Sequence, residues 1–228
     1  MKKSFVLIAL CTCLFSCKTT MVNLLIKDPK VENTETIKAF QQKHEYPTTN
    51  SLILVADTTA IVQEMFKGMS EGYYIFNSKG ELLCYNGQST CSGEQFRQFL
   101  KTSSETFTHC NDKNLTLDSV LAQTYDLNNQ PVQRKQFENT DYYIVSYWAK
   151  FMGGKRGYED AVLWMEEELA KNNSDTSVTF IKINTDLQES WGMKAGEKVR
   201  LKFKIKDNSM KLKLSDLPYE NPPSTVKS

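Results

Sequence analysis

The chain has 228 residues, of which 28 are basic and 27 acidic, so its formal net charge is only +1. This balance provides no general attraction for nucleic acid, and we expect no nucleic-acid partner. Aromatic residues make up 11% of the chain, which indicates a packed core rather than a disordered stalk.

The N-terminus has the pattern of an export signal. Two lysines follow Met1, and residues 5–14 form an apolar run that is too short to span a membrane as a helix. The next stretch, Leu14-Phe15-Ser16-Cys17, resembles the lipobox of bacterial lipoproteins; an ordinary secretory signal is the alternative. The resemblance implies a signal peptide over residues 1–16, acylation of Cys17 by chains such as palmitate, and a lipidated tether over residues 17–20. The chain is then a protein of the bacterial cell envelope held to the lipid bilayer through acylated Cys17, and Lys18 favours the outer membrane.

Three cysteines follow the predicted anchor: Cys84, Cys91 and Cys110. An odd number in an exported protein predicts at least one free thiol or an intermolecular bridge. Cys84 and Cys91 close a short loop and could pair in an oxidising compartment. Buried, unreacted cysteine is the alternative.

Residues 21–103 show strand and helix patterns in alternation. The predicted elements are a strand over 22–26, a helix over 33–44, a strand over 52–56, a helix over 59–69, a hairpin with strands 73–76 and 81–85, and a helix that starts after the capping-box pattern of residues 92–95. The hairpin, which includes Tyr74-Ile75-Phe76-Asn77-Ser78-Lys79-Gly80-Glu81-Leu82, resembles the second half of a thioredoxin fold. In that family a cis proline precedes this hairpin; here the position falls near Glu71-Gly72, and no proline is present.

A polar segment over residues 104–114 predicts a linker and contains His109 and Cys110. A histidine beside a cysteine is compatible with a metal site or a nucleophile. Adjacent residues of an extended segment point to opposite faces, however, and the chain has only one other histidine. We therefore expect no metal site and no cofactor.

Residues 142–183 predict a unit of two parallel strands joined by a helix. Residues 142–148 form a buried strand, a glycine-rich turn follows, apolar residues recur at helical spacing from Tyr158 to Leu169, and residues 178–183 form the second strand.

The turn after the first of these strands resembles the active-site turn of thioredoxin. Trp148-Ala149-Lys150-Phe151 precedes the two positions that hold cysteines in that family, and these positions hold Met152 and Lys155, with Gly153 and Gly154 between them. The resemblance implies that the fold is kept while the dithiol is lost, because disulfide exchange requires a thiolate.

The C-terminal part alternates apolar and basic residues over 199–206 and 210–214, which predicts a hairpin with one face on the core and one face in water. The lysines either protect a sheet edge from pairing with another chain or bind an anionic partner such as lipid headgroups. Residues 218–228 predict a flexible tail.

These patterns together predict an α/β protein with a thioredoxin-like mixed sheet flanked by helices. One possible arrangement has two subdomains, residues 21–103 and a degenerate second copy over 115–217; the alternative is one sheet whose halves occur in an unusual chain order. The predicted function is non-enzymatic: a redox-inactive scaffold that binds an envelope protein or an anionic ligand. The alternative is a thiol–disulfide redox protein acting through Cys84 and Cys91 or through Cys110. Cys91 stands before a predicted helix N-terminus, which lowers the pKa of a thiol.

Overall fold

A computed structural model describes residues 26–55, 65, 72–110, 114–137, 140–172, 176–206 and 209–218. The predicted signal peptide, Cys17 and the tether lie outside these residues. Most of the predicted strand 22–26, most of the predicted helix 59–69 and most of the predicted tail also lie outside them.

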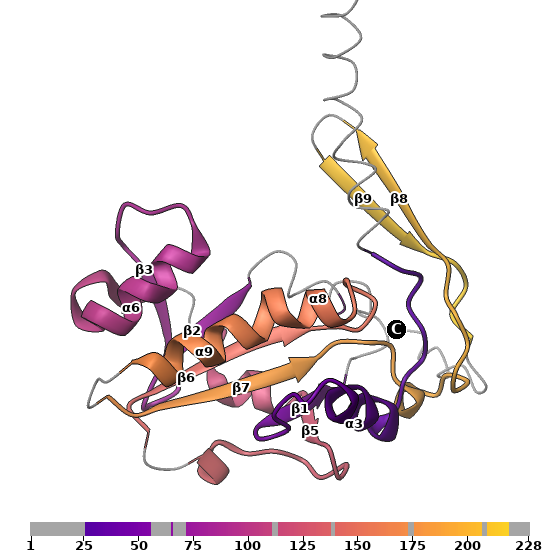
Figure 1. Ribbon diagram of the computed structural model, residues 1–228, viewed down its shortest axis with the longest axis horizontal. Helices are drawn as coiled ribbons and strands as arrows, with labels where there is room; N and C mark the ends of the chain where they lie inside the picture. Colours follow the sequence, from indigo (N-terminus) through magenta and orange to yellow (C-terminus); the bar gives the residue numbers. More distant parts are fainter. Residues whose placement is uncertain are drawn as a thin grey trace, which may run out of the picture.

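The centre of the fold is a seven-stranded mixed sheet (Figure 1). Its strands are β1 (Ser51–Leu54), β2 (Tyr73–Asn77), β3 (Leu82–Tyr85), β4 (Phe107–His109), β5 (Thr124–Asp126), β6 (Tyr142–Trp148) and β7 (Val178–Asn184). The strand order is β4-β3-β2-β6-β7-β1-β5. Neighbours β6, β7 and β1 are parallel, and every other pair in the sheet is antiparallel. The prediction of a mixed α/β protein is confirmed, as is the parallel pairing of β6 with β7.

The two predicted subdomains share this sheet. Strands β1, β2 and β3 come from residues 21–103, whereas β5, β6 and β7 come from residues 115–217. Strand β2 pairs along its whole length with β6, which places Ile75 opposite Ile144, and both residues are buried. This arrangement is the single-sheet alternative, in which the two halves occur in an unusual chain order. The predicted linker 104–114 also contains a strand, β4, at the edge of the sheet.

Helices cover both faces of the sheet because side chains alternate along each strand. Along β6, Ile144 and Trp148 join a buried cluster on one face, while Tyr143 and Val145 join another on the opposite face. The first cluster includes residues of α3 (Thr34–Lys43), α6 (Ser92–Thr106), α8 (Lys155–Tyr158), the π-helical turn η2 (Glu159–Leu163) and α9 (Trp164–Lys171). The second includes residues of α7 (Leu117–Leu121) and the 3₁₀ turn η1 (Arg134–Phe137).

The predicted C-terminal hairpin forms a two-stranded sheet of its own, made of β8 (Leu201–Lys206) and β9 (Ser209–Leu214). It extends away from the seven-stranded sheet (Figure 1). At its base, Leu201 and Leu214 are buried in a third apolar cluster, while Lys202 and Lys213 are exposed. The strands are therefore predicted correctly, but the hairpin joins the core through its base.

Candidate functional site

The turn between β6 and α8 lies at the carboxyl ends of parallel strands, the edge at which α/β sheets commonly bind ligands. Gly153 and Gly154 have φ angles of 90° and 57°. Glycine enters this left-handed region without the steric cost that a Cβ would add. Met152 pairs with Ile26 in an isolated antiparallel bridge, and Lys155 begins α8. The turn is thus a tight connection with a thioether and an ammonium group at the two positions that the resemblance assigns to thiols.

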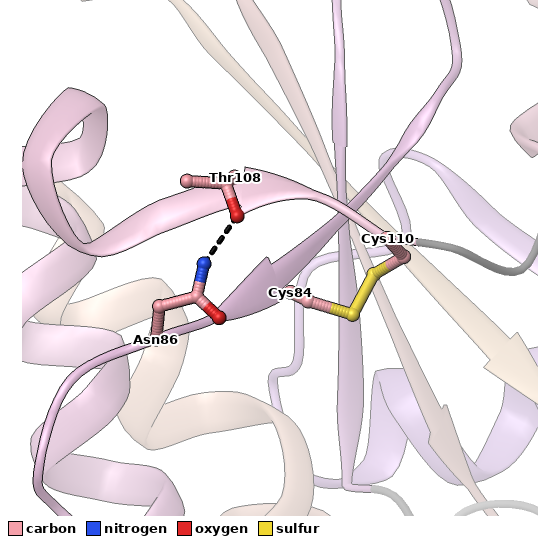
Figure 2. The surroundings of a disulfide bond; sticks show 4 residues. All are labelled: Cys84, Asn86, Thr108 and Cys110. Atoms are coloured by element: carbon pink, nitrogen blue, oxygen red, sulfur yellow. Dashed lines mark hydrogen bonds between the residues drawn. A yellow bond between two sulfur atoms is a disulfide. The ribbon is translucent and has the colours of Figure 1, made fainter.

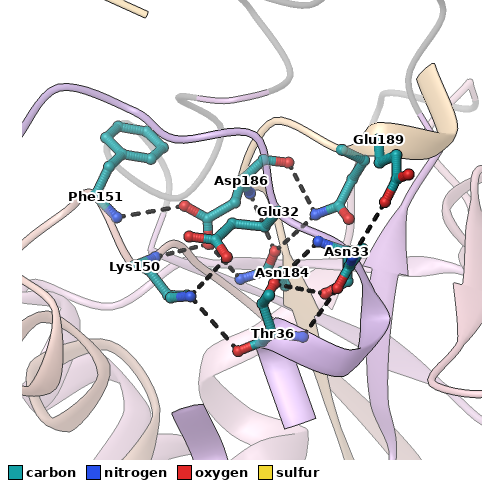
Figure 3. Close-up of polar contacts among 9 residues, drawn as sticks. Glu32, Asn33, Thr36, Lys150, Phe151, Asn184, Asp186 and Glu189 are labelled. Carbon is teal, nitrogen blue, oxygen red and sulfur yellow. Dashed lines mark hydrogen bonds and ion pairs between the residues drawn. The ribbon is translucent and has the colours of Figure 1, made fainter. Parts of the chain in front are cut away.

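The carboxylate of Asp186, which follows β7, holds this turn in place (Figure 3). Its Oδ2 accepts the backbone N–H of Lys150 at 2.8 Å, and its Oδ1 accepts that of Phe151 at 3.3 Å. The side-chain amide of Asn184 donates to Oδ2 at 2.8 Å. Asp186 is only 1% exposed. It therefore positions the backbone of the turn and does not meet a ligand in solvent.

Burial raises the pKa of Asp186 from 3.8 to about 6, because the ionised carboxylate loses its hydration. The hydrogen bonds from Lys150 and Asn184 favour the ionised form and lower the pKa, whereas the negative charge of Glu32 raises it. The group that fastens the turn therefore changes charge near pH 6.

A second carboxylate, Glu32, joins this polar cluster from the segment before α3. Its Oε2 lies 2.7 Å from Nζ of Lys150, and Glu32 is 4% exposed. The same segment exchanges backbone hydrogen bonds with the loop after β7: Glu32 N–H donates to Leu187 O, and Glu189 N–H donates to Glu32 O. Three segments far apart in the chain thus meet behind the turn (Figure 3).

A pocket of about 240 Å³ lies beside the turn. Half of its lining residues carry an aromatic ring or a thioether, and Asp160 adds one carboxylate. The lining residues are Gly72, Tyr73, Ser92, Tyr147, Trp148, Ala149, Met152, Gly157, Asp160, Ala161, Trp164 and Met165. Such a surface suits an apolar or aromatic group, which it would remove from water.

Trp148 contributes an unused hydrogen-bond donor to this region. The side chain is 1% exposed and packs against Phe40 and Tyr158. Its indole N–H has no acceptor among the residues that the structure describes. A buried donor without an acceptor costs free energy, about 1–3 kcal/mol in typical cases.

The cations at the start of α8 face acidic neighbours. Lys155 Nζ lies 3.6 Å from a carboxylate oxygen of Glu159, and Arg156 Nε lies 3.7 Å from one of Asp160. These pairs are exposed, so they add little to stability. They do place negative charge beside both cations, which disfavours binding of an anion at the start of α8.

The cysteines pair differently from the prediction (Figure 2). Cys84 on β3 forms a disulfide with Cys110, and Cys91 is a free, exposed thiol. The pairing follows from the antiparallel register of β3 and β4, which sets Cys84 opposite Thr108, two residues from Cys110. A hydrogen bond from Asn86 to Thr108 lies beside the bridge (Figure 2). The predicted bridge between Cys84 and Cys91 is therefore wrong.

His109 lies away from the turn and its pocket. Its Nδ1 lies 3.7 Å from Oε2 of Glu81, and both side chains are exposed. Its neighbour Cys110 is committed to the disulfide. The two adjacent residues therefore do not act together on one ligand.

The buried polar groups behind the turn were not predicted from the sequence as site residues. Asp186 offers the clearest signal, since it is an acidic residue directly after a buried parallel strand. Lys182, on β7, is another buried charged group that was not predicted: its Nζ lies 2.6 Å from Oε1 of Glu166 and 2.8 Å from the Pro47 carbonyl oxygen. Burial lowers the pKa of Lys182, and the ion pair with Glu166 partly offsets that effect.

Within the described ranges, no three or more His, Cys, Asp or Glu residues are grouped so as to hold a metal ion. No helix in that same part of the chain has both the length and the hydropathy to cross a membrane. Comparisons with models of protein families, with curated proteins and with solved structures found no match for this chain.

Proposed function

We propose that this chain is a lipid-anchored protein of the bacterial envelope that binds a partner protein at the β6–α8 turn, on a thioredoxin-like scaffold that has lost its dithiol. The anchor is acylated Cys17, which precedes the described residues by nine positions. The partner inserts an apolar side chain into the pocket beside Met152.

One observation carries this proposal: Gly72 and Met152 line the same pocket. By resemblance, Gly72 stands where thioredoxins have the cis proline and Met152 where they have the first cysteine. These two positions are eighty residues apart in the sequence, yet they meet at one surface. In a thioredoxin these two positions face each other at the dithiol. Here the surface keeps apolar character while Met152 and Lys155 remove the exchange chemistry.

The strand arrangement also supports a thioredoxin-like scaffold. The parallel β6 and β7 are joined by the helical segment from α8 to α9, and the antiparallel β2–β3 hairpin lies beside β6. A thioredoxin has the same neighbours, but its hairpin follows the two parallel strands in the chain, whereas here the hairpin precedes them. The chain order thus departs from the family pattern.

A photo-crosslinking residue placed at Met152 tests the proposal in membranes that contain the full chain. We expect one dominant crosslinked partner, whose yield does not change when thiols are blocked. Trp164→Ala removes a large side chain from the pocket wall and should weaken capture about 30-fold, as expected for the loss of an interface anchor of about 2 kcal/mol.

Lys135 is the matched control position, because it is exposed on η1 on the opposite side of the sheet. A crosslinker at Lys135 should not capture the same partner. Equal capture at Met152 and Lys135, or capture that Trp164→Ala leaves intact, would refute the binding site.

A second candidate function is thiol–disulfide exchange, which the exposure of two cysteines favours. Cys84 of the disulfide is exposed, and so is the free thiol of Cys91. Two results together would favour this function. Mass spectrometry should detect disulfide exchange between the chain and glutathione, and Cys91→Ser should abolish turnover of a disulfide substrate. If the unmodified chain does not turn over the disulfide substrate, this function is refuted.

A further inference from the structure

In the β8–β9 hairpin, positions that hold lysine pair mainly with each other, and positions that hold apolar residues pair with each other. Residues directly opposite each other in an antiparallel pair lie on the same face. The register pairs Lys202 with Lys213, Lys204 with Lys211, and Lys206 with Ser209. The alternate positions pair Phe203 with Leu212 and Ile205 with Met210. Along the ribbon, pairs of positions that hold lysine therefore alternate with pairs that hold only apolar residues.

The positive charge is concentrated in this part of the molecule. Seven of the 28 basic residues of the chain lie in the hairpin strands or just before them: Lys198, Arg200, Lys202, Lys204, Lys206, Lys211 and Lys213. The remainder of the chain contains more acidic than basic residues. An anionic surface would therefore attract the hairpin and repel the remainder, which orients the molecule.

The hairpin base is fastened to the segment that leads from the predicted anchor. Leu201 N–H donates to Oδ1 of Asp28 at 2.9 Å, and Val199 N–H donates to Pro29 O at 2.8 Å. Ile26 lies nine positions after Cys17, and nine residue steps of extended chain reach about 30 Å. Each hairpin strand has six residues, which corresponds to about 20 Å. An acyl chain on Cys17 would thus place the bilayer surface within reach of the whole hairpin.

We propose that the β8–β9 hairpin docks on the anionic surface of a lipid bilayer. The lysine positions lie within a Debye length of the headgroups and supply the attraction. This inference deepens the proposed function, since it gives the anchored protein a fixed orientation, and it rests on that function for the nearness of the membrane.

The test uses the full chain with Cys17→Ser, which carries no acyl chain, and two variants made in that background. The hairpin variant has Lys202, Lys204, Lys211 and Lys213 replaced by Gln. The control variant has the exposed Lys43, Lys79, Lys135 and Lys171 replaced by Gln, so that both lose the same charge. Binding is measured by sedimentation with vesicles of phosphatidylcholine alone or with one third phosphatidylglycerol.

We expect the hairpin variant to bind the phosphatidylglycerol vesicles at least about 100-fold more weakly than the control variant, because each lysine near an anionic surface contributes a several-fold gain. Replacing the same four lysines by Arg should restore binding, and 0.5 M salt should remove most of it. Equal binding by the hairpin and control variants would overturn the proposal. So would unchanged vesicle binding together with a loss of self-association, which would identify the hairpin as a contact between two copies of the chain.

The anchor is tested separately by the mass of the peptide that contains Cys17, isolated from membranes of cells making the unmodified chain. An unacylated Cys17 would refute the anchor, while hairpin-dependent vesicle binding would still support the docking surface. An acylated Cys17 together with equal vesicle binding by the two variants would support the anchor and refute the docking surface.

Discussion

Replacement of Asp186 by Asn removes the charge that fastens the β6–α8 turn and nearly preserves the shape of the side chain. One oxygen remains to accept the backbone N–H of Lys150, which Oδ2 accepts at 2.8 Å in the parent chain. The new amide group faces the N–H of Phe151, which Oδ1 accepts at 3.3 Å. The variant therefore loses the weaker of the two backbone hydrogen bonds, at a cost of about 1 kcal/mol.

The larger effect depends on pH. In the folded protein the pKa of Asp186 is raised from 3.8 to about 6, so the folded state holds this proton more tightly than the unfolded state does. The stabilisation is fully present below pH 4 and is lost as the pH rises through 6. Since the pKa rises from 3.8 to about 6, and each pKa unit corresponds to 1.36 kcal/mol, the free energy of unfolding of the parent chain is about 3 kcal/mol lower at pH 7 than at low pH through this group alone.

Urea unfolding of the parent and Asp186→Asn chains at intervals from pH 4 to pH 8 measures this contribution. The difference between their free energies of unfolding isolates Asp186, because the other titrating groups are common to both. We expect most of this change of about 3 kcal/mol to occur between pH 4 and pH 7, and we expect the difference to be flat above pH 7. Glu32→Gln should move the transition to lower pH, since the charge of Glu32 raises the pKa of Asp186. A difference that does not vary between pH 4 and pH 6 would refute the assignment.

Three further substitutions test other parts of the structure. Cys84→Ser opens a disulfide with a sequence separation of 26, which should lower the free energy of unfolding in urea by about 3.5 kcal/mol, whereas Cys91→Ser should leave it unchanged. Gly157→Ala places a Cβ 1.6 Å from the carbonyl oxygen of Met152 in the turn. We therefore expect the free energy of unfolding, measured by thermal unfolding, to fall by about 1–3 kcal/mol. Gly93→Ala is the control, because its new Cβ has no atom within 4 Å, and it should stabilise the protein slightly. Equal effects of the two substitutions on stability would contradict the packing described for the turn. Lys182→Met leaves the carboxylate of Glu166 without its cation and should lower the free energy of unfolding in urea by about 3 kcal/mol. An additional apolar replacement of Glu166 should restore most of that loss.

Local patterns were sufficient to predict the elements that carry the site. The apolar run over residues 142–148 and the helical spacing after it are properties of neighbouring residues, and they predicted β6, the following helix and β7. The capping box of α3 differs in detail from a Glu-containing one, since Asn33 pairs reciprocally with Thr36, but the helix limits agree with the prediction. These features depend on contacts within one turn or one strand.

The cysteine pairing and the single sheet depend instead on contacts between distant residues. β4 is a three-residue edge strand whose Thr108 and His109 are exposed, so it lacks the apolar alternation that predicts a strand. Its pairing with β3 decides which cysteine meets Cys84. Likewise, neighbouring strands in the chain usually pair with each other, and here the βαβ unit pairs with a hairpin that precedes it by some sixty residues.

The sequence predicted where the candidate site lies but not which buried polar residues hold it in place. The resemblance located the turn at Trp148 to Lys155, yet the groups that hold it come from before α3 and after β7. The segment before α3 contacts the turn directly, because Lys27 N–H donates to Phe151 O at 2.9 Å and Glu32 pairs with Lys150.

That same segment also fastens the base of the β8–β9 hairpin through Asp28 and Pro29. Residues 26–32 thus link the β6–α8 turn and the β8–β9 hairpin through hydrogen bonds and one buried ion pair. The segment therefore fixes the turn and the base of the hairpin relative to each other. If the hairpin docks on the bilayer as proposed, the turn would keep one orientation relative to the membrane, and a partner approaching along the membrane would meet the pocket beside Met152 from a constant direction.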